Sequence, residues 1–124
     1  MLAKIEEFEW EFNQRNKIAN NYSNALENYI TTPKIPDGSK SIWAQYTLKH
    51  EKREIIQEKL REKGIPTMVY YPIPMHMQAA YKKYYKEELI NAEKLSQEVF
   101  SIPMYPDMSA EIQEYVISNL VDIL

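Results

Sequence analysis

A chain of 124 residues is long enough for one domain with a core of moderate size, and its net charge of −3 gives no broad basic surface. We therefore expect neither nucleic acid nor a membrane as a partner, since no apolar run approaches the roughly 20 residues that span a bilayer. The chain has no cysteine, which excludes disulfides, thiolate catalysis and thiolate metal ligands and fits a cytoplasmic protein.

The first segment has an apolar periodicity that predicts one long helix from Leu2 to about Tyr29. Its apolar residues lie mostly three, four or seven positions apart: Leu2, Ile5, Phe8, Phe12, Ala19, Tyr22, Leu26 and Tyr29. No Ser, Thr, Asp or Asn precedes them as a cap, so we expect the helix to continue backward in a longer parent chain. Its start would then expose Leu2, Ile5, Phe8 and Phe12, and such an apolar patch favours a homodimer.

Short strands and helices are predicted to alternate after this helix. Runs of β-branched and aromatic residues predict strands at Ile42–Leu48, Thr67–Tyr71 and Val99–Met104. Apolar stripes predict helices at Glu51–Lys63, at Glu88–Glu98 and after a capping Ser109, with a helical turn within Ala79–Tyr85. The predicted fold class is α+β: a two-layer sandwich with a small, mostly antiparallel sheet of about three strands covered by helices. Residues 1–124 would form a single domain.

Two of these segments also predict how their side chains are divided between two faces. Alternation along the first strand places four residues on one face, namely Ile42, Ala44, Tyr46 and Leu48. The helix that follows would turn three apolar residues inward, namely Ile55, Ile56 and Leu60.

The stretch from Gly64 to Gln78 is the strongest candidate for a binding site. Gly64 can end the preceding helix with a positive φ, while Pro72 and Pro74 stop strand pairing and hold the backbone extended. A stiff backbone of this kind, with polar-tipped side chains among apolar ones, suits the wall of a binding site. The side chains it would present are Tyr70, Tyr71, His76 and Gln78.

Several of these residue types also have plainer interpretations. His76 would either hold the proline-rich stretch in place through a nearby carbonyl or face a substrate pocket. Trp43 is best explained by core packing, and Arg15 and Asn16 by a solvated or interhelical polar contact. His50 lacks the neighbouring ligands that would make it, with His76, a metal site.

The same stretch resembles a known family. Residues 64–81 read GIPTMVYYPIPMHMQAAY, which is similar to the segment GIPT-x-x-HYPxPLHxQ-x-xY of the DegT/DnrJ/EryC1/StrS aminotransferases. Three further stretches resemble the family's long helix, its strand entry and its closing segment: LAKIEEFEWEFNQRNKIANNYSNAL, TTPKIPDGSKSIWAQYTL and AEKLSQEVFSIPMYPDMSAEIQEYVI. Together they cover nearly the whole chain but only the C-terminal third of such an enzyme.

The resemblance implies the small C-terminal domain of a fold-type I enzyme that depends on pyridoxal phosphate (PLP). Such enzymes move an amino group, usually from glutamate, to a keto carbon of a nucleotide-linked sugar, as in the synthesis of cell-surface polysaccharides. The Schiff-base lysine belongs to the N-terminal PLP-binding domain, which this chain lacks, so no catalytic or cofactor-binding residue is expected here. Tyr71, His76 and Gln78 would place the substrate. Tyr70 stands where the family commonly has histidine, which weakens a role for it.

A second hypothesis belongs to a different class. The chain would be a stand-alone interaction or regulatory module that keeps the small-domain fold without the chemistry. In that case neither PLP nor a sugar substrate would be needed.

Overall fold

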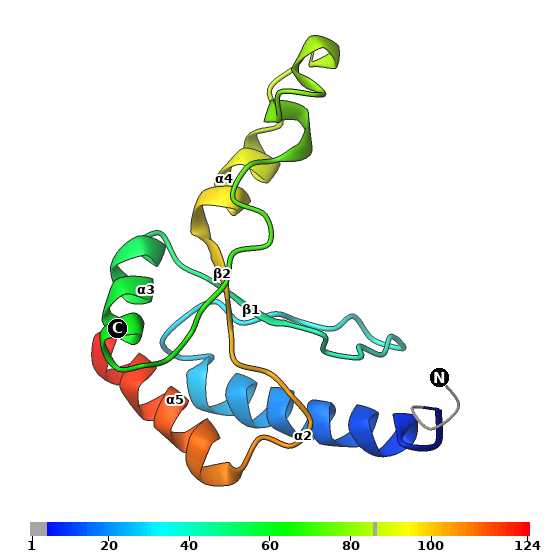
Figure 1. The fold of residues 1–124 in the computed structure, drawn as a ribbon, viewed down its shortest axis with the longest axis vertical. Helices are drawn as coiled ribbons and strands as arrows, with labels where there is room; N and C mark the ends of the chain where they lie inside the picture. Colours follow the sequence, from blue (N-terminus) through cyan, green and yellow to red (C-terminus); the bar gives the residue numbers. More distant parts are fainter. Residues whose placement is uncertain (1–4, 86) are drawn as a thin grey trace.

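The computed structural model describes residues 5–85 and 87–124, and its first long element is helix α2, Phe8–Leu26 (Figure 1). The helix buries Ile18, Ala19, Tyr22 and Leu26, which lie on one face at helical spacing. The predicted long helix is therefore confirmed, although it ends at Leu26 rather than near Tyr29. The predicted start at Leu2 lies outside the described residues.

In the part of the chain that the structure describes, the sheet has two strands rather than the three predicted. Strands β1, Tyr46–Lys49, and β2, Val99–Ile102, pair antiparallel with Thr47 opposite Ser101. The predicted strand at Thr67–Tyr71 is reduced to a single bridge, in which Met68 and Ser101 exchange amide–carbonyl hydrogen bonds of 3.1 and 2.7 Å. Proline at positions 66 and 72 removes the amide donors that would extend this pairing in either direction.

The strand predicted at Ile42–Leu48 begins only at Tyr46. Trp43 has a positive φ of 48° and turns its indole inward, so Trp43 is buried while Ile42 is 57% exposed. The indole Nε1–H donates to the Asn16 side chain at 3.1 Å. Tyr46 and Leu48 are both buried on one face, as the alternation predicts, whereas Ile42 and Ala44 are exposed and do not share that face, because the chain is not yet extended there.

The other helices agree with the predicted segments. They are α3, Arg53–Glu62, α4, Ile90–Glu98, and α5, Ala110–Ile123, with 3-10 turns η1, Met75–Met77, and η2, Lys82–Tyr84. Gly64 follows α3 with a φ of 73°, a conformation that favours glycine. The Ser109 hydroxyl accepts the Ile112 amide N–H at 3.3 Å and caps α5. The α+β class is confirmed.

Figure 1 shows two unequal parts. Helices α2, α3 and α5 lie close together beside the two strands, whereas α4 and the preceding 3-10 turns project away from them. We call residues 70–98 the arm and the remaining described residues the body. The chain passes from α4 directly into β2, so the arm joins the sheet without a connecting loop.

The core of the body is built around aromatic residues that α2 and the sheet share. The Tyr22 and Tyr46 rings lie 5.1 Å apart, and the Trp43 and Tyr46 rings 5.5 Å apart. The Tyr22 hydroxyl donates to the Pro103 carbonyl at 3.0 Å, and burial raises the pKa of Tyr22. The Tyr46 hydroxyl is bonded to Ser23 and the Trp43 indole N–H to Asn16, so each of these three polar tips has a partner, which removes most of the cost of burying it.

Helix α3 shows where the predicted inward stripe is too wide. Ile56 and Leu60 are buried, but Ile55 is 55% exposed. Ile55 and Ile56 are adjacent, so their side chains point about 100° apart, and packing on α5 selects Ile56 and Leu60, which are four residues apart. Among the described residues, no helix is both long and apolar enough to cross a membrane.

The contrast between two residues of α3 gives a stability prediction. Leu60→Ala should lower the free energy of unfolding by about 2–5 kcal/mol, because it leaves a cavity in the core. Ile55→Ala, on the same helix, should change it by less than about 0.5 kcal/mol. Urea unfolding followed by circular dichroism measures both, and equal losses would contradict the observed orientation of α3.

Candidate functional site

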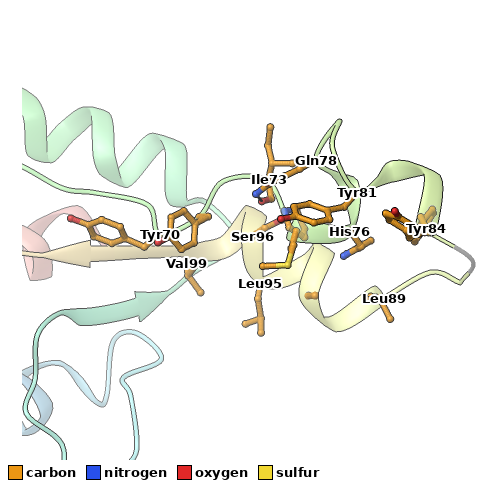
Figure 2. Close-up of a pocket in the computed structure, with 15 residues that line it drawn as sticks. Tyr70, Ile73, His76, Gln78, Tyr81, Tyr84, Leu89, Leu95, Ser96 and Val99 are labelled. Atoms are coloured by element: carbon orange, nitrogen blue, oxygen red, sulfur yellow. Dashed lines mark hydrogen bonds between the residues drawn. The ribbon is translucent and has the colours of Figure 1, made fainter.

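An open groove of about 780 Å³ runs along the arm, between the proline-rich stretch and α4 (Figure 2). It is lined mainly by aromatic and aliphatic side chains with a few polar tips, the usual character of a binding site for a small organic molecule. All four residues singled out in the sequence lie in its wall: Tyr70, Tyr71, His76 and Gln78. Folding therefore gathers them along one groove.

The two tyrosines of the sequence motif are unequally exposed. Tyr71 is 74% exposed and Tyr70 is 44% exposed, and their rings meet edge to face at 6.3 Å. The peptide bond between them is cis. Figure 2 shows Tyr70 at the end of the groove nearest β2, while Tyr84 and Leu89 lie at the far end. Tyr70 and Tyr71 thus stand where the arm meets the body.

His76 is held more firmly than its neighbours. Its side chain is only 14% exposed, its Nε2 lies 3.1 Å from Glu93 Oε1, and its ring stacks on Tyr85 at 5.1 Å. The partner is thus a carboxylate, not the carbonyl that the plainer interpretation of the sequence supposed. His76 both anchors the stretch to α4 and contributes to the groove wall.

Gln78 stabilises the turn that carries it. Its amide nitrogen donates to the Ile73 carbonyl at 3.4 Å, and the residue is exposed. The side chain therefore has polar atoms at the groove surface that a ligand can also reach.

Glu93 is a residue of this site that the sequence did not single out. Its Oε1 accepts hydrogen bonds from the Leu89 amide at 3.1 Å and from the Tyr85 hydroxyl at 3.4 Å, besides the contact with His76. The hydrogen bond from His76, followed by that from the Leu89 amide, holds the pKa of Glu93 below its ordinary value. The available signal was an acidic residue in the first turn of a predicted helix, which commonly marks a helix N-terminus.

The residues for which the sequence favoured a plain structural role all have partners within the fold. Trp43 packs in the core as predicted, and Asn16 receives its indole N–H. Arg15 donates to the Trp43 carbonyl at 3.0 Å, so the polar contact of this helix is to a loop. His50 accepts the Lys52 amide N–H through Nδ1 at 3.0 Å. Within the described ranges, no group of three or more possible metal-ligating side chains occurs.

Among the described residues, those that line the groove do not match the needs of a PLP site. Formation of the internal linkage needs a lysine amine in a sheltered pocket, and the phosphate needs a cradle of backbone amides. Every lysine of the described part is exposed except Lys49, which is half-buried and lies 3.4 Å from Glu98. No described lysine and neither glycine lines the groove. The arrangement can bind and orient a ligand, but it presents no amine nucleophile to one.

Comparison with known proteins identifies the same family that the sequence motifs resemble. The model of the DegT/DnrJ/EryC1/StrS aminotransferase family matches residues 1–121. The chain is 41% identical over 115 residues to a pleiotropic regulatory protein of Geobacillus stearothermophilus, covering 88% of this chain and 31% of that protein. It is 39% identical over 107 residues to the UDP-2-acetamido-2-deoxy-3-oxo-D-glucuronate aminotransferase of Pseudomonas aeruginosa, covering 86% of this chain and 30% of that enzyme. The chain thus spans about a third of the length of these relatives.

Solved structures of aminotransferases superpose on this chain. A DegT DnrJ EryC1 StrS aminotransferase from Brucella abortus superposes with a TM-score of 0.92 at 35% identity, covering 97% of this chain and 33% of that one. NtdA from Bacillus subtilis, solved with its cofactor PMP, superposes with a TM-score of 0.81 at 31% identity, covering 91% of this chain and 28% of that one.

The Glu93 contacts predict how the arm responds to acid. A carboxyl group with a depressed pKa adds stability that is complete above its ordinary value, here 4.5, and that is lost as the pH falls through the lowered pKa. Carbon-13 NMR of the Glu93 side chain should therefore show a pKa below 4.5. His76→Ala should move that pKa upward, toward 4.5. An unchanged pKa in this variant would contradict the assigned cause.

Proposed function

This chain belongs to the DegT/DnrJ/EryC1/StrS aminotransferase family, and we propose that residues 1–124 form the C-terminal small domain of a PLP-dependent enzyme that aminates a nucleotide-linked keto-sugar. The observation that carries the proposal is the superposition on the Brucella abortus aminotransferase, which covers nearly all of this chain and a third of that one. A chain of this kind supplies one part of the enzyme, and the N-terminal PLP-binding domain supplies the rest.

The groove along the arm forms one wall of the substrate cleft in this proposal. Tyr71, His76 and Gln78 place the nucleotide-sugar, and Tyr70 contributes from the base of the arm. Three features support this role: the apolar lining, the exposed polar tips and the position of the groove on the part of the molecule that projects from the body. Aromatic faces pack on the apolar faces of a sugar or base while hydroxyl and amide tips bind its polar groups.

The division of chemistry follows from the residues present. The N-terminal domain of such an enzyme supplies the lysine and binds PLP, which provides the electron sink for exchange of an amino group between glutamate and the sugar. This chain binds and orients the substrate and shields one side of it from water. The absence of cysteine fits a reaction in the reducing cytoplasm, where the proposal places it.

A second candidate is a non-catalytic regulatory module with the same fold. The relative from Geobacillus stearothermophilus, which is named a pleiotropic regulatory protein, favours this alternative. In that case the groove binds a ligand or protein segment without turnover.

The coding DNA upstream of this segment separates the two candidates. A continuous reading frame for an α/β domain with a lysine near its end is expected, and the protein expressed from the whole frame should transfer the amino group of glutamate to a nucleotide-linked keto-sugar. In that protein Tyr71→Ala should raise KM roughly tenfold or more, since a good substrate contact contributes about 1.4 kcal/mol or more. Tyr29→Ala, which removes an exposed tyrosine outside the arm, is the control and should leave both KM and kcat unchanged. A stop codon just upstream would favour the regulatory module.

Self-association of the chain is expected through the start of α2. Ile5 and Phe8 are 65% and 58% exposed there, beside a hollow of about 230 Å³ lined in part by Phe8, Phe12 and Ile42. Burial of this surface in a homodimer removes apolar area from water. Sedimentation velocity should show a dimer that dissociates on dilution, and Phe8→Ser should weaken it. Ile112→Ser, at an exposed site on α5, should not. A strictly monomeric chain at high concentration would refute the expected dimer.

A further inference from the structure

One carboxylate oxygen joins three separate segments of the arm. Glu93 Oε1 is within hydrogen-bond distance of His76 Nε2 from η1, of the Tyr85 hydroxyl just after η2, and of the Leu89 amide at the start of α4. The distances are 3.1, 3.4 and 3.1 Å, respectively. The His76 and Tyr85 rings also stack on each other, so the two side chains that meet at Glu93 support one another.

The arm has little else to hold its shape. Between Tyr70 and Leu95, no described residue is buried, so this stretch has no hydrophobic core of its own. Its backbone hydrogen bonds are local, such as those from Gln78 to Met75 and from Tyr84 to Tyr81. In the described ranges, the His76–Glu93 contact is the one hydrogen bond or ion pair between residues 72–78 and α4.

We infer that Glu93 is a positioning residue that sets the width and shape of the groove. Glu93 does not itself line the groove, but the three residues that its carboxylate contacts, His76, Tyr85 and Leu89, do. A carboxylate accepts several hydrogen bonds at once and gains strength from its charge, which suits a point where three segments meet. This inference goes beyond the proposed function, because it concerns the geometry of the groove whichever ligand the groove takes.

Two substitutions separate the charge of Glu93 from its shape. Glu93→Gln keeps a side chain of the same size with one acceptor oxygen, whereas Glu93→Ala removes the acceptor altogether. Gln97→Ala is the control, since Gln97 is exposed on the same helix and tests the effect of a truncation on α4 itself. The body residues Leu48 and Leu60 report whether the rest of the fold is intact.

NMR of the 124-residue chain tests the inference. In the unsubstituted chain and in Gln97→Ala, cross-peaks between the His76 and Tyr85 rings are expected. Glu93→Ala should lose them while the signals of Leu48 and Leu60 remain unchanged, and Glu93→Gln should restore part of their intensity. Cross-peaks that persist in Glu93→Ala would overturn the inference. So would a loss of the Leu48 and Leu60 signals, which would assign Glu93 to the stability of the whole fold. Neither result depends on transamination, so the proposed function stands or falls separately.

Discussion

The contact between Tyr22 of α2 and Tyr46 of β1 is the interaction on which the body depends. Their rings lie 5.1 Å apart in a fully buried position, and each hydroxyl is bonded to another segment. Tyr22 reaches the Pro103 carbonyl just after β2, and Tyr46 reaches the Ser23 hydroxyl at 2.7 Å. The pair thus fixes the helix against both strands at once, by apolar area and by two directional bonds. A sheet of only two short strands needs such support, because a two-stranded ribbon is marginally stable alone.

The arm is stabilised in a different way from the body. The body buries a continuous apolar cluster, whereas the arm exposes most of its apolar side chains and relies on polar contacts. Surfaces of this kind are typical of recognition elements that a rigid scaffold presents. The contrast agrees with the proposed division of labour, in which the body provides rigidity and the arm provides contacts to a ligand.

Local signals in the sequence were sufficient to predict much of this fold. Gly64 and Ser109 mark helix ends through backbone conformation and capping, which depend on neighbouring residues only. The four residues predicted for the site line one groove because they lie in one short stretch whose prolines constrain the backbone. Contacts between residues far apart in the chain could not be predicted from such local signals. The inward turn of Trp43 depends on Asn16, 27 residues earlier in the chain. The loss of the third strand, by contrast, follows from Pro66 and Pro72, a local signal to which the strand prediction gave too little weight. Glu93 escaped notice because its partner His76 lies 17 residues earlier, on a segment with no periodic relation to α4.

Ser101 has a consequence for how this architecture can change. It pairs with Thr47 on one side and with Met68 on the other, so the chain leaves the sheet at Met68 and returns to it one strand spacing away. The segment between these points is therefore an insertion whose two ends are hydrogen-bonded to each other. The length and side chains of such an insertion can change during evolution, and with them the ligand that the molecule binds. The body keeps its own hydrophobic core throughout.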